Sequence, residues 1–111
     1  MRDYDERYYE KKLVSGINHL GGLCWKFVSP GHAGVPDRII LLPGGHVLFA
    51  EMKAPGKTER PLQRVLQLKM TQLGITVFPS VNTVEKIDAV LARCAEMIQS
   101  DKTSKEGGDA V

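Results

Sequence analysis

The sequence predicts an α/β fold in which a mixed four-stranded sheet is flanked by helices. Apolar residues recur at helical spacing in three segments, one near each end of the chain and one after residue 61. Short apolar runs lie between these segments, and Pro-Gly-Gly at residues 43–45 separates two of the runs. A strand, a helix and another strand follow that turn, which implies a crossover to a parallel neighbour. The predicted order is αβββαβα.

The first helix is predicted over residues 4–20, with Gly21-Gly22 as its end. Its apolar stripe consists of Tyr9, Leu13, Ile17 and Leu20. A first strand follows at residues 23–28, where Trp25 and Phe27 are expected in the core rather than as a platform for stacked bases.

A β-hairpin is predicted from residues 38–42 and 46–50, two apolar runs joined by a three-residue loop. Pairing symmetric about Gly44 places Leu41 opposite Val47 and Ile39 opposite Phe49. The same register places Asp37 opposite Glu51. A slip of one residue would move these two carboxylates to opposite faces of the sheet.

The second half of the chain begins with a polar loop at residues 54–60, after which Pro61 suits the first position of a helix. This helix is expected to end at Gly74 and to be followed by a strand at residues 75–78. Its predicted inner stripe consists of Leu62, Val65, Leu66, Met70 and Leu73.

A last helix is predicted with Asn82 as its N-cap and Glu85 completing a capping box. Its predicted inner stripe consists of Val84, Ile87, Leu91, Cys94 and Ile98. The expected domain covers residues 1–100, and the polar residues 101–111 are expected to form a disordered tail.

The bulk composition fits one soluble domain of 111 residues with a single core, 42% hydrophobic and 25% charged. With 15 Lys and Arg against 13 Asp and Glu, the chain is only mildly basic, which permits nucleic-acid binding without requiring it. Its N-terminal segment does not resemble a signal peptide, and its apolar runs are too short to cross a membrane. A cytoplasmic protein is expected, with Cys24 and Cys94 as buried free thiols.

The predicted pairing brings two like charges together, because Asp37 and Glu51 lie opposite each other with Lys53 on the same face. Such an arrangement suggests a bound cation, and carboxylate oxygens suit Mg²⁺ or Mn²⁺. Taken alone, Asp37 also fits a turn residue, and Glu51 with Lys53 fits a solvated charge pair. A metal-dependent nuclease is the more specific hypothesis, compared with these structural interpretations.

The placed residues resemble the VRR-NUC family, a branch of the PD-(D/E)xK nuclease superfamily, over residues 6–91. The resemblance rests on Gly22, Lys26-Phe27, Ser29-Pro30-Gly31, Gly34-Val35-Pro36-Asp37-Arg38, Pro43-Gly44-Gly45, Glu51-Met52-Lys53-Ala54, Pro61-Leu62-Gln63 and Gly74. It implies the restriction-endonuclease-like αβββαβ core, here followed by a C-terminal helix.

The resemblance also implies roles for individual residues. Asp37, Glu51 and the backbone carbonyl of Met52 would bind the divalent metal, and Lys53 would orient or deprotonate the attacking water. An acidic residue of the first helix would complete the site, with Glu10 preferred over Glu6. Gln63 would contact the site or the substrate backbone, with Gln67 as its rival.

Four further residues are candidates for contacts with nucleic acid: Lys26, His32, Arg38 and Lys57. Each also has a structural interpretation. Lys26 on its strand would extend to solvent instead, His32 would be a plain loop residue, and Arg38 would form an ion pair.

The family resemblance implies a Mg²⁺- or Mn²⁺-dependent DNA endonuclease. The expected substrates are branched DNAs such as Holliday junctions or flaps, cut by a homodimer in the cytoplasm of a bacterium or a phage-infected cell. The alternatives are a non-catalytic nucleic-acid-binding module and a metal-binding scaffold for a partner protein.

Overall fold

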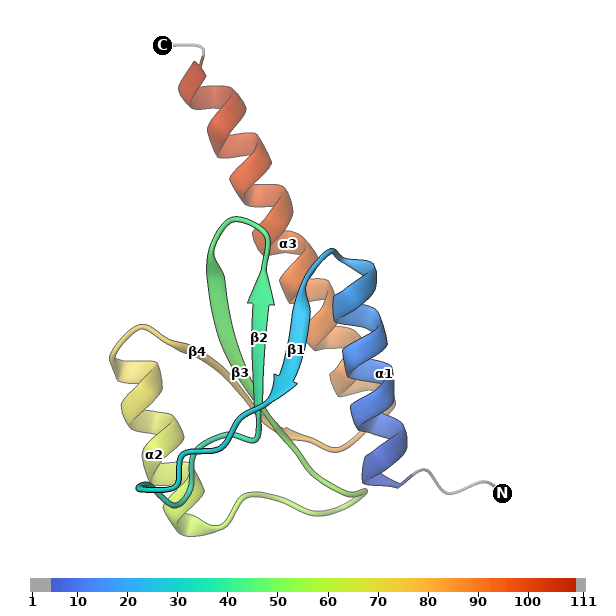
Figure 1. Ribbon diagram of the computed structural model, residues 1–111, viewed down its shortest axis with the longest axis vertical. Coiled ribbons are helices and arrows are strands. Elements are labelled where there is room, and N and C mark those ends of the chain that lie inside the picture. Colours follow the sequence, from blue (N-terminus) through green and yellow to red (C-terminus); the bar gives the residue numbers. More distant parts are fainter. Residues whose placement is uncertain (1–4, 110–111) are drawn as a thin grey trace.

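The computed structural model describes residues 5–109, with side chains as far as residue 102. The helices and strands follow the predicted order (Figure 1). They are α1 (Glu6–His19), β1 (Leu23–Lys26), β2 (Arg38–Leu42), β3 (His46–Met52), α2 (Pro61–Gln72), β4 (Thr76–Val81) and α3 (Val84–Asp109). None of the helices described is long and apolar enough to cross a membrane.

The four strands form one mixed sheet in the order β1-β2-β3-β4. The first three strands are antiparallel, and β4 is parallel to β3, as the strand–helix–strand segment predicted. The hairpin has the predicted register, because Leu41 pairs with Val47 and Ile39 pairs with Phe49. Its turn requires glycine, since Gly44 and Gly45 have φ values of 91° and 81°.

A β-bulge interrupts the pairing of β3 with β4 beside Glu51. Ala50 pairs with Phe78 and Met52 pairs with Val81, so β4 carries one extra residue at this point. Ser80 lies in that extra segment with a φ of 44°, a left-handed conformation that is uncommon outside glycine. The bulge therefore re-aims the end of β4 next to the end of β3.

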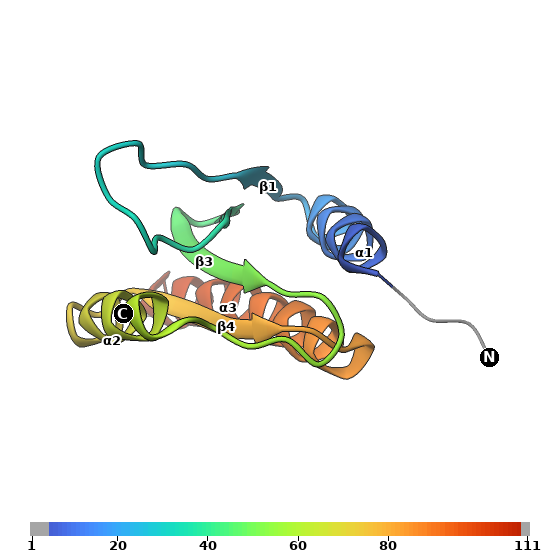
Figure 2. The same cartoon turned by 90° about the horizontal axis from the view of Figure 1, so that it is seen from below.

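The core lies between one face of the sheet and the helices α1 and α3. From the sheet it takes alternate residues such as Ile40 and Leu48, both fully buried. The predicted stripe of α1 is confirmed for Tyr9, Leu13 and Ile17. In Figure 2, α1 and α2 lie at opposite sides of the molecule with the strands between them.

Both cysteines are buried and free, as predicted. Burial raises the pKa of each thiol to about 11, so at neutral pH both remain protonated. They act as small core side chains.

The predicted inner stripe of α2 is wrong at three of its five positions, while Leu66 and Met70 are half-buried. Leu62, Val65 and Leu73 are 55%, 52% and 81% exposed, and the buried residue of this helix is Gln67. The physical reason is position, because α2 packs against the edge strand β4 rather than across the sheet. A helix at an edge buries only a narrow face.

The core position predicted for Trp25 is also wrong, because 55% of this residue is exposed. Trp25 lies on the edge strand β1, on the face of the sheet opposite α1 and α3, where Leu23 is 45% exposed. Phe27 is half-buried and packs edge-on against Phe49 with ring centroids 5.2 Å apart.

The start of α3 differs from the prediction by one residue. Thr83 is its N-cap, since its hydroxyl accepts a hydrogen bond from the Lys86 N–H at 3.1 Å. Asn82 instead donates its side-chain amide to the carbonyl of Lys57 at 2.7 Å and ties the polar loop to the end of β4.

The helix α3 extends to Asp109, into residues 101–111, for which a disordered tail was predicted. At the first of these residues, a side chain of the helix contacts the hairpin. His46 at the start of β3 and Asp101 on α3 approach to 2.5 Å, and the turn at Gly44 lies against the same carboxylate. Residues 110–111 of the predicted tail lie outside the described part of the chain.

Candidate active site

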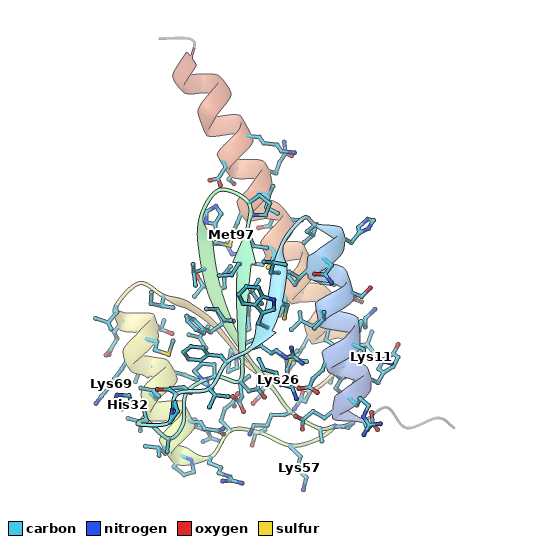
Figure 3. The ribbon with its side chains drawn as sticks, in the orientation of Figure 1. Lys11, Lys26, His32, Lys57, Lys69 and Met97 are labelled. Carbon is cyan, nitrogen blue, oxygen red and sulfur yellow. The ribbon has the colours of Figure 1, made fainter. Side chains whose placement is uncertain are left out.

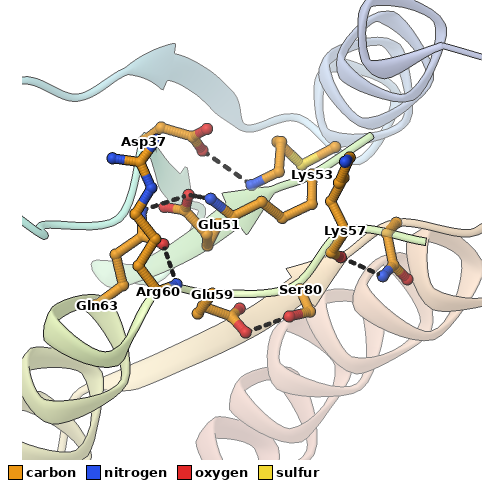
Figure 4. Close-up of polar contacts among 10 residues, drawn as sticks. Asp37, Glu51, Lys53, Lys57, Glu59, Arg60, Gln63 and Ser80 are labelled. Atoms are coloured by element: carbon orange, nitrogen blue, oxygen red, sulfur yellow. Dashed lines mark hydrogen bonds and ion pairs between the residues drawn. The ribbon is translucent and has the colours of Figure 1, made fainter. Parts of the chain in front are cut away.

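Carboxylates gather at the end of the sheet where β2 begins and β3 ends. Asp37 immediately precedes β2, and its Oδ1 accepts a hydrogen bond from the backbone N–H of Met52 at 3.0 Å (Figure 4). The ladder between the two strands ends at the pair Arg38 and Ala50, so Asp37 and Glu51 occupy the next position of the same register. The structure therefore brings these two predicted residues together at one site.

Glu51 is the most buried acid of this site, with 3% of its surface exposed. Its Oε2 forms an ion pair with the ammonium of Lys53 and accepts a hydrogen bond from the amide of Gln63, both at 3.0 Å. Its Oε1 is buried without a hydrogen-bond partner. Since a buried carboxylate oxygen without a partner is costly, the free Oε1 fits a ligand position for a cation.

Asp37 has a pKa raised from 3.8 to about 7. Burial is the main cause, the Met52 N–H opposes it, and the negative charges of Glu51, Glu10 and Glu6 raise the pKa further. A divalent cation would counter both the burial and the repulsion. The raised pKa of Asp37 and the contacts of Glu51 therefore both fit a metal site.

The first turns of α1 contribute the remaining acids. Glu6, Glu10 and Asp37 each offer a ligand atom, and these atoms lie within 4.8 Å of one another. Both acids that compete for the helix position are therefore close to Asp37. Glu10 differs in also pairing with Arg38, at 3.5 Å. Hard oxygen ligands of this kind suit Mg²⁺ or Mn²⁺.

Gln63 links the first turn of α2 to the site. Its Oε1 accepts a hydrogen bond from the backbone N–H of Arg60 at 2.9 Å, while its Nε2 donates to Glu51. The same side chain therefore caps the helix and holds the carboxylate. Gln67, its rival, lies elsewhere and lines a pocket with Glu59.

Of the predicted nucleic-acid contacts, two lie together and two lie apart. Lys26 and Arg38 line one groove beside α1. His32 lies near α2, away from Lys26, and Lys57 extends outward from the polar loop (Figure 3). Arg38 is only 8% exposed and forms the ion pair that its structural interpretation required.

Three residues of interest were not among the sequence candidates. Arg7 and Lys11 line the same groove as Lys26, and their spacing of four residues on a helix was the signal that would have identified them. Glu59 is buried and accepts a hydrogen bond from the hydroxyl of Ser80. No pattern in the sequence points to Glu59, because it lies in an irregular polar loop.

The sequence matches no protein-family model. It is 46% identical over 74 residues to "Putative nuclease p44" of Acyrthosiphon pisum secondary endosymbiont phage 1, an alignment that covers 67% of this chain and 80% of that protein. The fold resembles a solved structure titled "VRR_NUC domain" with a TM-score of 0.72 and 27% identity, over 78% of this chain and 94% of the other. The mixed sheet and its helices thus have the restriction-endonuclease-like fold, and the chain belongs to the VRR-NUC family of nucleases.

Proposed function

We propose that this nuclease is a Mg²⁺- or Mn²⁺-dependent DNA endonuclease that hydrolyses phosphodiester bonds. The observation that carries the proposal is the buried, unpartnered Oε1 of Glu51, a residue that lies across the strand register from Asp37. Asp37 in turn belongs to the acidic set with Glu6 and Glu10. A phosphodiester is an anion, so a site of acids alone would repel it. A bound cation reverses that charge.

The residues present fit a divalent cation. Asp37, Glu51, the carbonyl of Met52 and Glu10 would hold it, with Glu6 close enough to Asp37 to share the role. When bound, such an ion supplies Lewis-acid catalysis and lowers the pKa of a water molecule. The residues of the chain then have to orient the substrate and remove a proton from the attacking water.

We assign the handling of this proton to Lys53. Its ammonium lies 3.0 Å from Glu51 and its side chain is 17% exposed, so it reaches solvent from inside the site. It would orient the attacking water, help to remove its proton and stabilise negative charge on the phosphate. Gln63 would keep Glu51 in place for this chemistry.

The proposed substrates are branched DNAs such as Holliday junctions or flaps, cut by two copies of the chain. An exposed apolar face of the sheet supports self-association. Leu23, Trp25 and Val47 share this face by register and are 45%, 55% and 47% exposed. Contiguous apolar surface of this kind is typical of an interface, and a two-fold dimer would place one site on each of two strands.

The dimer is tested by replacing Trp25 with Lys. Because the charge would be buried against a second copy, the Trp25→Lys variant is expected to sediment as a monomer at concentrations where the wild type is dimeric. Leu73→Lys is the matched control, since Leu73 is 81% exposed at the end of α2. A wild-type monomer, or dimers in both variants, would contradict this surface.

The endonuclease is tested with four-way junction, flap, duplex and single-stranded DNA in Mg²⁺, Mn²⁺ or chelator. We expect cleavage that requires the metal and favours the junction or the flap, and that falls at least about 100-fold in Glu51→Gln. Glu85→Gln, at an exposed position of α3, is the control and is expected to cut normally. Metal binding without cleavage would support the scaffold alternative, and cleavage undiminished in Glu51→Gln would show that another site or protein is responsible.

A further inference from the structure

A groove between α1 and β1 has a cavity volume of about 520 Å³, and half of its lining residues are basic. Four of its side chains are basic, and a hydroxyl and an amide lie beside them. These residues are Arg7, Lys11, Lys26, Arg38, Ser15 and Asn18. Glu10 is the acid among the lining residues.

The positive charge of this groove is poorly compensated. Within the described part of the chain, Arg7, Lys11 and Lys26 form no ion pair at 4.0 Å or less. Arg38 is 8% exposed and pairs with Glu10 through one terminal nitrogen, while its Nε is buried without a partner. Four cations that converge on a cavity with one acid, Glu10, leave a net positive charge there, which favours the binding of an anion.

The groove adjoins the candidate metal site through Glu10. This residue lines the groove and also belongs to the acidic set with Glu6 and Asp37. Asp37 and Arg38 are consecutive residues, so the chain directs a carboxylate to one site and a guanidinium to the other. An extended polyanion that reaches the metal site would therefore pass into the groove.

We propose that this groove binds backbone phosphates of the DNA strand adjacent to the bond that is cut. The proposal rests on the proposed function and adds the path of the strand, which runs from the acids of β2 and β3 along α1 between Arg7 and Asn18. Arg7, Lys11 and Lys26 pair with the phosphates, and Ser15 and Asn18 supply neutral donors. Phosphate contacts fix position without reading sequence, so the groove aligns a strand whatever its bases.

An acidic segment of a partner protein is the competing occupant. DNA is favoured because the groove continues into a set of carboxylates, which would repel an acidic peptide and which a metal ion would adapt to a phosphate. The two occupants differ in their response to salt, because DNA binding releases counterions in proportion to the number of phosphates contacted.

The test measures the binding of the full chain to labelled duplex DNA by fluorescence anisotropy, in chelator so that no strand is cut, over a range of KCl concentrations. In Arg7→Gln and in Lys11→Gln, the slope of log affinity against log salt is expected to fall by about 0.9, the value of one phosphate contact. Lys12→Gln is the matched control. It removes the same charge from the next residue of α1, but Lys12 pairs with Asp88 at 3.5 Å and lies outside the groove.

The result that supports the groove is a reduced slope in Arg7→Gln and Lys11→Gln with an unchanged slope in Lys12→Gln. Equal losses in all three variants would show only a general effect of charge and would overturn the proposal. So would unchanged slopes combined with weaker binding of a poly-glutamate peptide in Arg7→Gln. Because both groove positions are exposed, circular dichroism is expected to show unchanged folding.

Cleavage by the wild type separates the two proposals. If the wild type cuts DNA in Mg²⁺ while the groove variants keep the full salt slope, the groove proposal is wrong and the endonuclease proposal is still supported. If the wild type neither binds nor cuts any of the DNAs, both proposals are wrong.

Discussion

Replacing Lys53 with Gln is expected to lower the rate of DNA cleavage about 10²–10⁴-fold, the range typical for a group that transfers a proton or stabilises developing charge. Lys53 and Gln63 are the two donors that hold Oε2 of Glu51, both at 3.0 Å. A glutamine at position 53 keeps a polar amide on a side chain one atom shorter, but it neither carries a charge nor titrates. The substitution therefore removes the charged, titratable group, while Gln63 still donates its hydrogen bond to Oε2 of Glu51.

The measurement is single-turnover cleavage with saturating Mg²⁺, together with metal affinity by calorimetry. We expect the rate to fall while the metal affinity changes little, because Lys53 is not a ligand in the proposed site. Lys69→Gln, at an exposed position near the end of α2, is the matched control and should cut at the wild-type rate. If Lys53→Gln lost metal affinity in proportion to its rate, Lys53 would be a residue that positions Glu51 rather than one that takes part in the reaction.

The main architecture was predictable because the antiparallel hairpin carries strong local signals. Pro-Gly-Gly fixed the turn, and alternation then fixed which residues face each other, so that Leu41 meets Val47. This register is what brings Asp37 next to Glu51. The stripe of α1 was equally clear because this helix packs across the core, where helical periodicity and burial coincide.

The predictions that were wrong depend on which surfaces are covered by other parts of the fold, and a single sequence does not show that. The apolar face of α2 and Trp25 both have the composition of a core, yet they lie at the two edges of the sheet and remain exposed. The shift of the α3 cap from Asn82 to Thr83 has a similar origin. Both residue types cap helices, and the contact of Asn82 with the distant Lys57 carbonyl determines which of them does so.

In the candidate site, too, the part that depends on local sequence was predictable and the part that depends on distant packing was not. Asp37, Glu51 and Lys53 are close in sequence and share one hairpin, so their proximity follows from the register. The approach of α1 does not, because it depends on packing over the whole sheet. The sequence left Glu6 and Glu10 as alternatives, whereas both lie near Asp37.

Replacing Asp37 with Asn is expected to abolish metal-dependent cleavage and, in the absence of metal, to stabilise the fold above neutral pH. The folded-state pKa of Asp37 is about 7, raised from 3.8. Between these two values the folded protein holds a proton that the unfolded chain has released, so the stability of the wild type falls as the pH rises from about 4 to about 7. Above that range the buried charge faces Glu51, Glu10 and Glu6 without compensation.

Asparagine avoids this cost and keeps the backbone contact, since its side-chain oxygen still accepts the Met52 N–H. At pH 8 in chelator, we expect the Tm of Asp37→Asn to exceed that of the wild type by about 4–8 °C, which corresponds to about 1 kcal/mol in a domain of this size. We expect the two proteins to melt together at pH 4. The expected shift is small because Asp37 is partly exposed and solvent screens its charge.

Addition of Mg²⁺ or Mn²⁺ at pH 8 should then reverse the order of stability. The ion binds the folded wild type and raises its Tm by mass action, whereas Asp37→Asn lacks the ligand and responds weakly. Asp88→Asn, at the exposed partner of Lys12 on α3, is the control and should follow the wild type in both respects. A Tm difference that does not change with pH, or a metal response retained in Asp37→Asn, would show that Asp37 is not the residue that couples charge, metal and stability. The expected pattern means that Asp37, the acid required for cleavage, destabilises the folded protein in the absence of metal, as is common for groups at a functional site.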